Sequence, residues 1–294
     1  MTSPVIEASL LTKDHLTPVL RKRFRALDGL TLKIFPRETF GLLGLNGAGK
    51  TTTLKLLLGL LRPTKGSVSV LGFPAGDRRA LRRIGFLPEN PYFYSYLTAQ
   101  EFLVFVGQLF GLSRKERLDR SRELLKMVSL SAAANTLLVK YSKGMLQRLG
   151  IAQSLVNDPS LIFWDEPTSG LDPVGRRDVR TILLRLKDEG KTIFFNSHLL
   201  PDVNEVCDRV GVLHKGRLVA EERIASISGG GSYRDLEDFF MDQVMQAEPP
   251  VAVGAGTGPA RKASEVAPTG AEEPVSGGYT AGGADLSQSE GDGG

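Results

Sequence analysis

The sequence predicts an α/β fold in which a mostly parallel β-sheet forms the core and a helical subdomain is inserted. Short apolar runs alternate with longer segments of helical periodicity, the order expected for parallel strands and their crossover helices. The run 161–164 is apolar throughout, as in a strand buried on both faces of a sheet. From about 89 to 158 the periodicity is helical, which predicts the inserted subdomain.

The N-terminal segment predicts a smaller antiparallel β subdomain. Apolar runs at 5–13 and 26–34 flank a basic segment at 21–25, so we expect two paired strands joined by a loop. The basic segment is interpreted as a solvated face, with a binding patch as the alternative. Val68 and Val70 alternate with polar residues, which indicates a further half-buried strand.

A glycine-rich loop lies between an apolar run at 40–43 and a helical pattern. The loop reads Gly44-Leu45-Asn46-Gly47-Ala48-Gly49-Lys50-Thr51-Thr52. Its glycines allow backbone N–H groups to converge on an anion at the positive end of the following helix. Lys50 is expected to reach the β- and γ-phosphates, and the Thr51 hydroxyl to hold Mg²⁺. The stretch predicts a triphosphate cradle (P-loop); a glycine-rich turn before a structural helix is the alternative.

The helical subdomain carries recognisable helix starts. Thr98 with Glu101 and Ser113 with Glu116 each fit a reciprocal capping box. A third helix is expected to open just after Ser142. An aromatic group in the preceding loop fits either core packing or an exposed docking surface, and it comprises Tyr92, Phe93, Tyr94 and Tyr96.

The last third of the sequence continues the alternation. Asp172 and Pro173 predict the N-cap and first position of a helix, and 192–195 predicts a buried strand. A hairpin turning at Lys215-Gly216 follows. The predicted organisation is a nucleotide-binding domain at 1–228, an amphipathic helix at 229–247 and a disordered Gly/Pro/Ala/Glu-rich tail at 248–294.

The composition limits the classes of protein to which the chain can belong. The 294 residues are 41% hydrophobic and 24% charged, which is ordinary for a globular protein. Cys207 is the single cysteine, so no internal disulfide can form. We find no signal-peptide pattern and no apolar run long enough to span a membrane, so a cytoplasmic location is expected and a membrane role needs a partner. The net charge of +4 is unevenly spread, because the segment from Gln246 onward holds two basic and seven acidic residues. The rest of the chain is therefore strongly basic, which suits nucleotides, anionic lipid or nucleic acid alike.

Two further segments carry chemistry. Asp165 and Glu166 follow the buried run 161–164, where side chains emerge at the carboxyl edge of a parallel sheet. One carboxylate there can hold Mg²⁺ and the other can polarise a water, whereas a pair of capping acids is the alternative. Ser142 and Gly144 open a helix and form a second anion site, or an ordinary N-cap.

Taken together, these motifs resemble the ATP-binding-cassette (ABC) ATPases. The resemblance rests on the cradle, YSKGM at 141–145, LIFWDEP at 161–167, SGLD at 169–172 and His198, in that order. It covers about residues 5–225. The runs RALDGLTLKI and IGFLPENPYFYSYLT are similar to the ATPase subunits of type-two ABC exporters.

The resemblance implies a site shared between two chains. In that family two cassettes meet head to tail, so that the signature residues of one chain close over the ATP held by Lys50 of the other; here they are Ser142, Lys143, Gly144 and Met145. Asp165 would then position Mg²⁺, Glu166 would polarise water and His198 would contact the γ-phosphate. Ser169 and Asp172 would belong to the loop that links the two sites.

Three positions depart from the family pattern. The usual switch glutamine is Glu89, which could still bind the metal ion or water. His15 best matches the place of the aromatic residue that stacks on adenine. Met145 replaces the usual glutamine of the signature.

The resemblance implies an ATP- and Mg²⁺-dependent ATPase that drives a separate membrane permease, with export as the expected direction. A homodimer is favoured because one chain carries every motif, and a location on the inner face of the membrane is expected through the permease. The alternative is an ABC ATPase acting on nucleic acid or ribosomes, although no long coiled coil and no second cassette is present. A small-molecule kinase or GTPase that uses the same cradle is a third interpretation, although the sequence contains no Asn-Lys-x-Asp motif of the kind that reads guanine. No nucleic-acid partner is expected.

Overall fold

A computed structural model describes residues 3–16, 23–228 and 233–248, all within the compact unit 1–250. The unit 251–294 lies outside the described residues, as does nearly all of the predicted tail. So do residues 17–22, which include part of the basic segment expected between the first two strands.

The core is a six-stranded sheet with the order β10-β9-β3-β8-β7-β6. Strands β9, β3, β8, β7 and β6 pair in parallel and β10 pairs antiparallel with β9, so the predicted mostly parallel sheet is confirmed. The strands span Thr39–Leu43 (β3), Ile84–Leu87 (β6), Leu161–Asp165 (β7), Thr192–Ser197 (β8), Arg209–His214 (β9) and Arg217–Arg223 (β10). The carboxyl ends of β3, β7 and β8 therefore share one edge.

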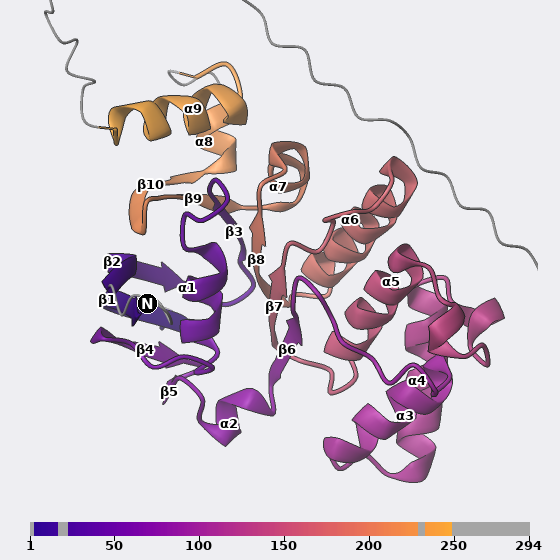
Figure 1. Cartoon of the computed structure of the whole chain (residues 1–294). Coiled ribbons are helices and arrows are strands. Elements are labelled where there is room, and N and C mark those ends of the chain that lie inside the picture. The colour runs from indigo at the N-terminus through magenta and orange to yellow at the C-terminus, as the bar shows by residue number, and fades with distance from the viewer. Residues whose placement is uncertain (1–2, 17–22, 229–232, 249–294) are drawn as a thin grey trace, which may run out of the picture. The chain divides into compact units, whose positions relative to one another are not determined.

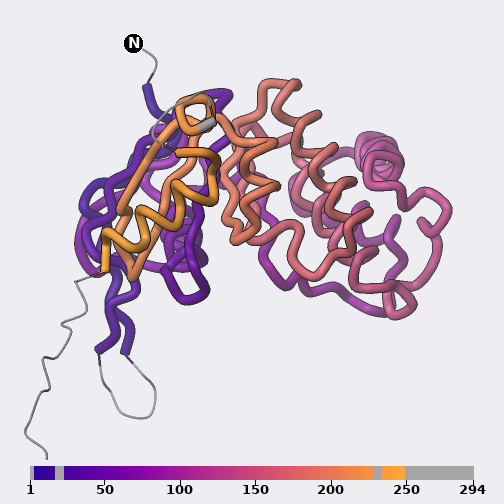
Figure 2. The backbone as a smooth tube through the Cα atoms, turned by 90° about the horizontal axis from the view of Figure 1, so that it is seen from above, coloured from indigo at the N-terminus to yellow at the C-terminus, as the bar shows by residue number. Residues whose placement is uncertain are grey.

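The predicted N-terminal antiparallel sheet is also present, with the order β2-β1-β4-β5. Its strands span Ile6–Leu16 (β1), Arg23–Ile34 (β2), Lys65–Val70 (β4) and Phe73–Pro74 (β5). Figures 1 and 2 show this sheet and the helical subdomain on opposite sides of the six-stranded sheet.

The helical subdomain is inserted between β6 and β7. It contains α3 (Ala99–Leu109), α4 (Arg114–Met127) and α5 (Lys143–Ser154), with short 3₁₀ turns at Ser131–Ala133 and Leu138–Lys140. Both predicted capping boxes are formed. In the aromatic group before α3, Phe93 packs edge-on against Phe102 of α3, whereas Tyr92 and Tyr96 are 92% and 72% exposed.

The remaining helices flank the two sheets (Figure 1). They span Lys50–Leu57 (α1), Arg78–Leu81 (α2), Pro173–Asp188 (α6), Leu200–Val206 (α7), Ile224–Ser228 (α8) and Leu236–Gln246 (α9). The helix expected at 229–247 occupies 236–246, and residues 229–232 lie outside the described residues. None of the described helices has both the length and the apolarity needed to cross a membrane.

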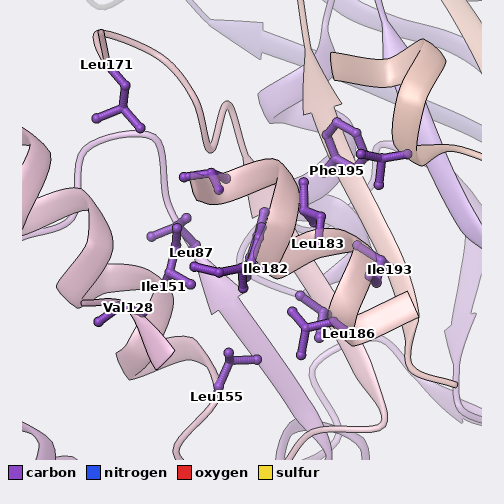
Figure 3. Packing of buried hydrophobic residues seen from close by; sticks show 14 of the residues in the cluster. Leu87, Val128, Ile151, Leu155, Leu171, Ile182, Leu183, Leu186, Ile193 and Phe195 are labelled. Carbon is purple, nitrogen blue, oxygen red and sulfur yellow. The ribbon is translucent and has the colours of Figure 1, made fainter. Parts of the chain in front are cut away.

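Two hydrophobic clusters cover the two faces of the six-stranded sheet. Ile162 and Trp164 of β7 belong to the cluster that includes the helical subdomain and α6, whereas Leu161 and Phe163 belong to the cluster under α1 and the N-terminal sheet. Figure 3 shows α6 directing Leu183 into the first of these clusters. Because both faces are buried, the strand is apolar at successive positions rather than alternating.

Candidate nucleotide site

The glycine loop between β3 and α1 has a backbone that larger residues cannot adopt. Gly49 has φ +111°, and a β-carbon there would lie 2.6 Å from the Ala26 carbonyl oxygen. At Gly44 a β-carbon would lie 2.5 Å from the Leu213 carbonyl oxygen. The loop is thus held between β2 and the β9–β10 hairpin, and Gly216 of that hairpin donates its N–H to the Ala48 carbonyl at 2.9 Å.

The N-terminus of α1 is open to an anion. No side chain caps this helix. Within the part of the chain that the structure describes, the N–H groups of Asn46 and Gly47 meet no backbone acceptor. Free N–H groups beside a helix N-terminus form a phosphate site, which is the arrangement predicted for the cradle.

A cavity of about 660 Å³ opens over this loop, a size suited to a nucleotide. It is lined by Phe24, Ala26, Leu45, Asn46, Gly47, Gly49, Lys50, Thr51, Thr52, Glu89, Glu166, Ser169 and His198. The cradle, the second carboxylate and the histidine are therefore brought together from three separate parts of the sequence.

A chain of polar contacts crosses the floor of this cavity. The Lys50 ammonium donates to the Gly44 carbonyl at 2.7 Å and lies 3.2 Å from Glu166 Oε1. The other oxygen of Glu166 lies 2.7 Å from His198 Nδ1. Lys50 and Glu166 are each only 7% exposed, so the pair is shielded from water and its electrostatic interaction is strong.

The backbone around the carboxylates is held by β8. Glu166 has φ +52°, a left-handed conformation that is uncommon for a residue other than glycine. Its N–H donates to the Asn196 carbonyl at 3.1 Å, and the Asn196 side-chain amide donates to Asp165 Oδ1 at 2.8 Å. Asn196 directly follows the strand predicted at 192–195, and the sequence analysis assigned it no role. The available signal was a polar residue at the end of a buried apolar run.

The donor atoms near the cradle fit a magnesium ion. Thr51 and Glu89 line the cavity, whereas Asp165, which is 3% exposed at the end of β7, does not. These residues offer only hydroxyl and carboxylate oxygens, the ligands that Mg²⁺ prefers. Among the described residues no group of three or more His, Cys, Asp or Glu could hold a metal by itself.

The aromatic residue in the cavity is Phe24 rather than His15. His15 lies on β1 opposite Phe24 on β2, and it does not line the cavity. Phe24 is 56% exposed there. Phe24 belongs to the basic segment at 21–25, which the sequence analysis interpreted only by its charged residues.

The signature residues lie apart from this cavity. Ser142 caps α5 by accepting a hydrogen bond from Met145 N–H at 3.3 Å, and none of the residues 142–145 lines the cavity. Lys143 packs its ammonium end against Gly170, where a β-carbon would lie 2.4 Å from its Nζ. Asp172 caps α6 as predicted. The signature segment of a chain therefore lies outside the nucleotide cavity of that chain.

Comparison with known proteins supports a family assignment. Residues 27–169 match the family model described as ABC transporter. The chain is 49% identical over 231 residues to an uncharacterized ABC transporter ATP-binding protein of Nostoc sp., in a match that covers 78% of this chain and 69% of the relative. The chain belongs to the family of ABC transporter ATP-binding proteins.

Two further relatives have names that include ABC transport or ATP binding. The chain is 41% identical over 222 residues to the bacitracin transport ATP-binding protein BcrA of Bacillus licheniformis, with 74% of this chain and 70% of the relative covered. For a relative from Synechocystis sp., 47% identical over 234 residues, the match covers 77% of this chain and 66% of the relative, slightly less than two thirds of its length.

Solved structures agree with the fold of this ABC ATPase. An ATP-binding subunit of an ABC transporter superposes with a TM-score of 0.71 at 29% identity, covering 81% of this chain and 99% of the other. The ATP-binding cassette MJ0796, a dimer bound to ADP and Pi after hydrolysis, gives 0.69 at 27% identity, covering 74% and 98%. The predicted family, fold class and ATPase type are confirmed, and nothing in these matches supports the nucleic-acid alternative.

Proposed function

We propose that this ABC ATPase hydrolyses ATP at a site completed by a second copy of the chain, and thereby drives a membrane permease in export. The observation that carries the proposal is the Glu166 carboxylate, shared between Lys50 and His198 at the floor of the cavity. That arrangement supplies a phosphate-binding cation, a base for water and a γ-phosphate contact in one place.

ATP binding would rearrange these groups. Lys50 would exchange Glu166 for the β- and γ-phosphates, and Phe24 would stack on the base at the outer end of the cavity. Thr51, Asp165 and Glu89 would hold Mg²⁺, which would neutralise charge on the phosphates. The freed Glu166 carboxylate would then orient and deprotonate the attacking water.

The second copy would provide the missing half of the site. Ser142 and Gly144 of the partner would bring a helix N-terminus to the γ-phosphate. A homodimer is supported by the presence of both half-sites in one chain: Lys50, Glu166 and His198 form one and Ser142 with Gly144 the other. Ser169 and Asp172 would lie in the loop between the two sites.

The permease is proposed to be a separate membrane protein, which would hold the ATPase at the inner face of the membrane. Support comes from BcrA, a relative named for bacitracin transport. Tyr92 and Tyr96 are exposed just after Glu89, a lining residue of the cavity. A permease that docks on these tyrosines would sense nucleotide through a short segment of backbone.

The hydrolytic part of this proposal is tested with Glu166→Gln in the full chain. We expect the wild type to release phosphate from ATP with Mg²⁺, and the variant to retain ATP binding while losing about 10²- to 10³-fold in rate, the usual effect of removing a general base. Glu189→Gln, at the exposed C-cap of α6, is the matched control and should keep the wild-type rate. Rapid turnover by Glu166→Gln would contradict the role of this carboxylate.

The transport part is tested by isolating the full chain from membranes of its native cell and identifying the co-purifying proteins. A membrane-spanning partner is expected. Recovery of ribosomal components alone would contradict the proposal in favour of the nucleic-acid alternative.

A further inference from the structure

A buried hydrogen bond joins the loop after Glu166 to the helix after His198. The Thr168 hydroxyl donates to Asp202 Oδ2 at 2.7 Å. Thr168 is 2% exposed and Asp202 is 4% exposed, and neither residue lines the nucleotide cavity. The hydrogen bond is therefore buried outside the nucleotide cavity.

The environment of Asp202 keeps its carboxylate in place. It lies in the first turn of α7, where the helix dipole favours a negative charge. Its other oxygen lies 3.7 Å from Arg180 Nε, and Arg180 also contacts Glu205 on the same helix. A buried carboxylate with these partners is a costly group to retain for packing alone, because an apolar residue of similar volume would fill the same space.

The loop that contains Thr168, the donor of this bond, also carries a strained residue. Glu166 is in the left-handed region, so its conformation persists only if the surrounding contacts impose it. The loop is fixed from α5 by Gln147, which donates to the Pro167 carbonyl at 2.9 Å. It is fixed from α7 by the bond between Thr168 and Asp202. Of these two contacts, only the second joins the loop to the segment that follows His198; the bond from Glu166 N–H to the Asn196 carbonyl joins the loop to the segment that precedes it.

We propose that Thr168 and Asp202 are a positioning pair that sets the spacing between Glu166 and His198. Helix α7 begins at Leu200, directly after the His198 segment, so the bond links the backbone on both sides of the 2.7 Å contact between Glu166 and His198. The inference rests on the proposed function, in which these two side chains act on the γ-phosphate and water. Loss of the bond lets the two loops move apart without changing the cradle.

The matched substitutions are Thr168→Val, which keeps the shape and removes the donor, and Thr168→Ser, which keeps the hydroxyl. A displacement of about 1 Å at reacting groups costs up to about 10²-fold in rate, so we expect kcat for ATP hydrolysis to fall about 10- to 100-fold in Thr168→Val. KM for ATP should stay within about twofold, since the phosphate and base contacts are intact. Thr168→Ser should restore kcat to within about threefold of the wild type.

A double-mutant cycle with His198→Ala separates positioning from general destabilisation. If the bond acts through the spacing to His198, Thr168→Val should cost less than about twofold once His198 is absent. A merely structural role predicts the same loss in both backgrounds. The inference is overturned by equal losses, by wild-type kcat in Thr168→Val, or by failure of Thr168→Ser to restore the rate.

A second variant covers the case in which Thr168→Val does not fold. Thr168→Val with Asp202→Leu replaces both partners of the hydrogen bond by apolar groups of similar shape, and Arg180 keeps Glu205 as an ion-pair partner, so little stability is lost. It should fold, bind ATP and show the same loss of kcat; wild-type kcat in this variant would also overturn the inference.

Failure of this inference can be distinguished from failure of the proposed function. If Glu166→Gln turns over ATP rapidly, the proposed function itself fails. If Glu166→Gln is inactive and Thr168→Val is unaffected, only the positioning pair is wrong.

Discussion

Without nucleotide, Glu166 competes with ATP for Lys50, so removing its charge should tighten ATP binding. At 3.2 Å, two unit charges in an effective dielectric of about 20 attract by about 5 kcal/mol. Desolvation of both groups offsets most of that energy, and His198 shares the carboxylate. We expect a net effect of about 1–2 kcal/mol, which makes ATP affinity in Glu166→Gln about 5- to 30-fold higher.

The assay is isothermal titration calorimetry of the full chain with ATP in EDTA, so that hydrolysis does not interfere. Glu166→Asp keeps the negative charge and is the matched control, with affinity expected near that of the wild type. Because Lys50 and Glu166 are buried, the gain should persist in high salt. Equal or weaker binding by Glu166→Gln would refute the argument that ATP must displace this carboxylate from Lys50.

Two further predictions concern affinity and stability. Phe24→Ala should weaken ATP binding by about 1 kcal/mol through loss of base stacking, whereas His15→Ala should leave the dissociation constant unchanged; equal effects in calorimetry would contradict the assignment of Phe24. Ser154→Ala should lower the free energy of unfolding by about 1–3 kcal/mol in urea denaturation, because it leaves the buried indole N–H of Trp164 without the acceptor that now lies at 2.9 Å. An unchanged midpoint would show that this N–H finds another partner.

The buried strands could be predicted because burial on both faces of a sheet requires a continuous apolar run within a few neighbouring residues. Phe163 and Trp164 point into different hydrophobic clusters, so the run in which they lie is apolar without interruption. The capping boxes before α3 and α4 were predictable for a similar reason, since each depends on residues three positions apart. The cradle was predictable because all of its residues lie in one continuous stretch, 44–52.

The parts that escaped prediction depend on pairing between distant segments. The choice between His15 and Phe24 depends on which of two paired strands presents its side chain to the cavity, and the register between β1 and β2 contains irregularities. Asn196 and Asp202 acquire partners only when β7, β8 and α7 are brought together. Such contacts produce no short-range residue pattern that sequence analysis could detect, because they join residues about thirty positions apart.

A mixing experiment tests most directly the claim that the site is shared between two chains. Lys50→Ala removes the phosphate cation, and Ser142→Asp keeps an N-cap for α5 while directing a negative charge at the partner's γ-phosphate. Each variant alone should be inactive. Mixed in equal amounts, they should recover about a quarter of the wild-type rate, since half of the dimers are mixed and each holds one intact site. A mixture as inactive as its components would contradict the shared site.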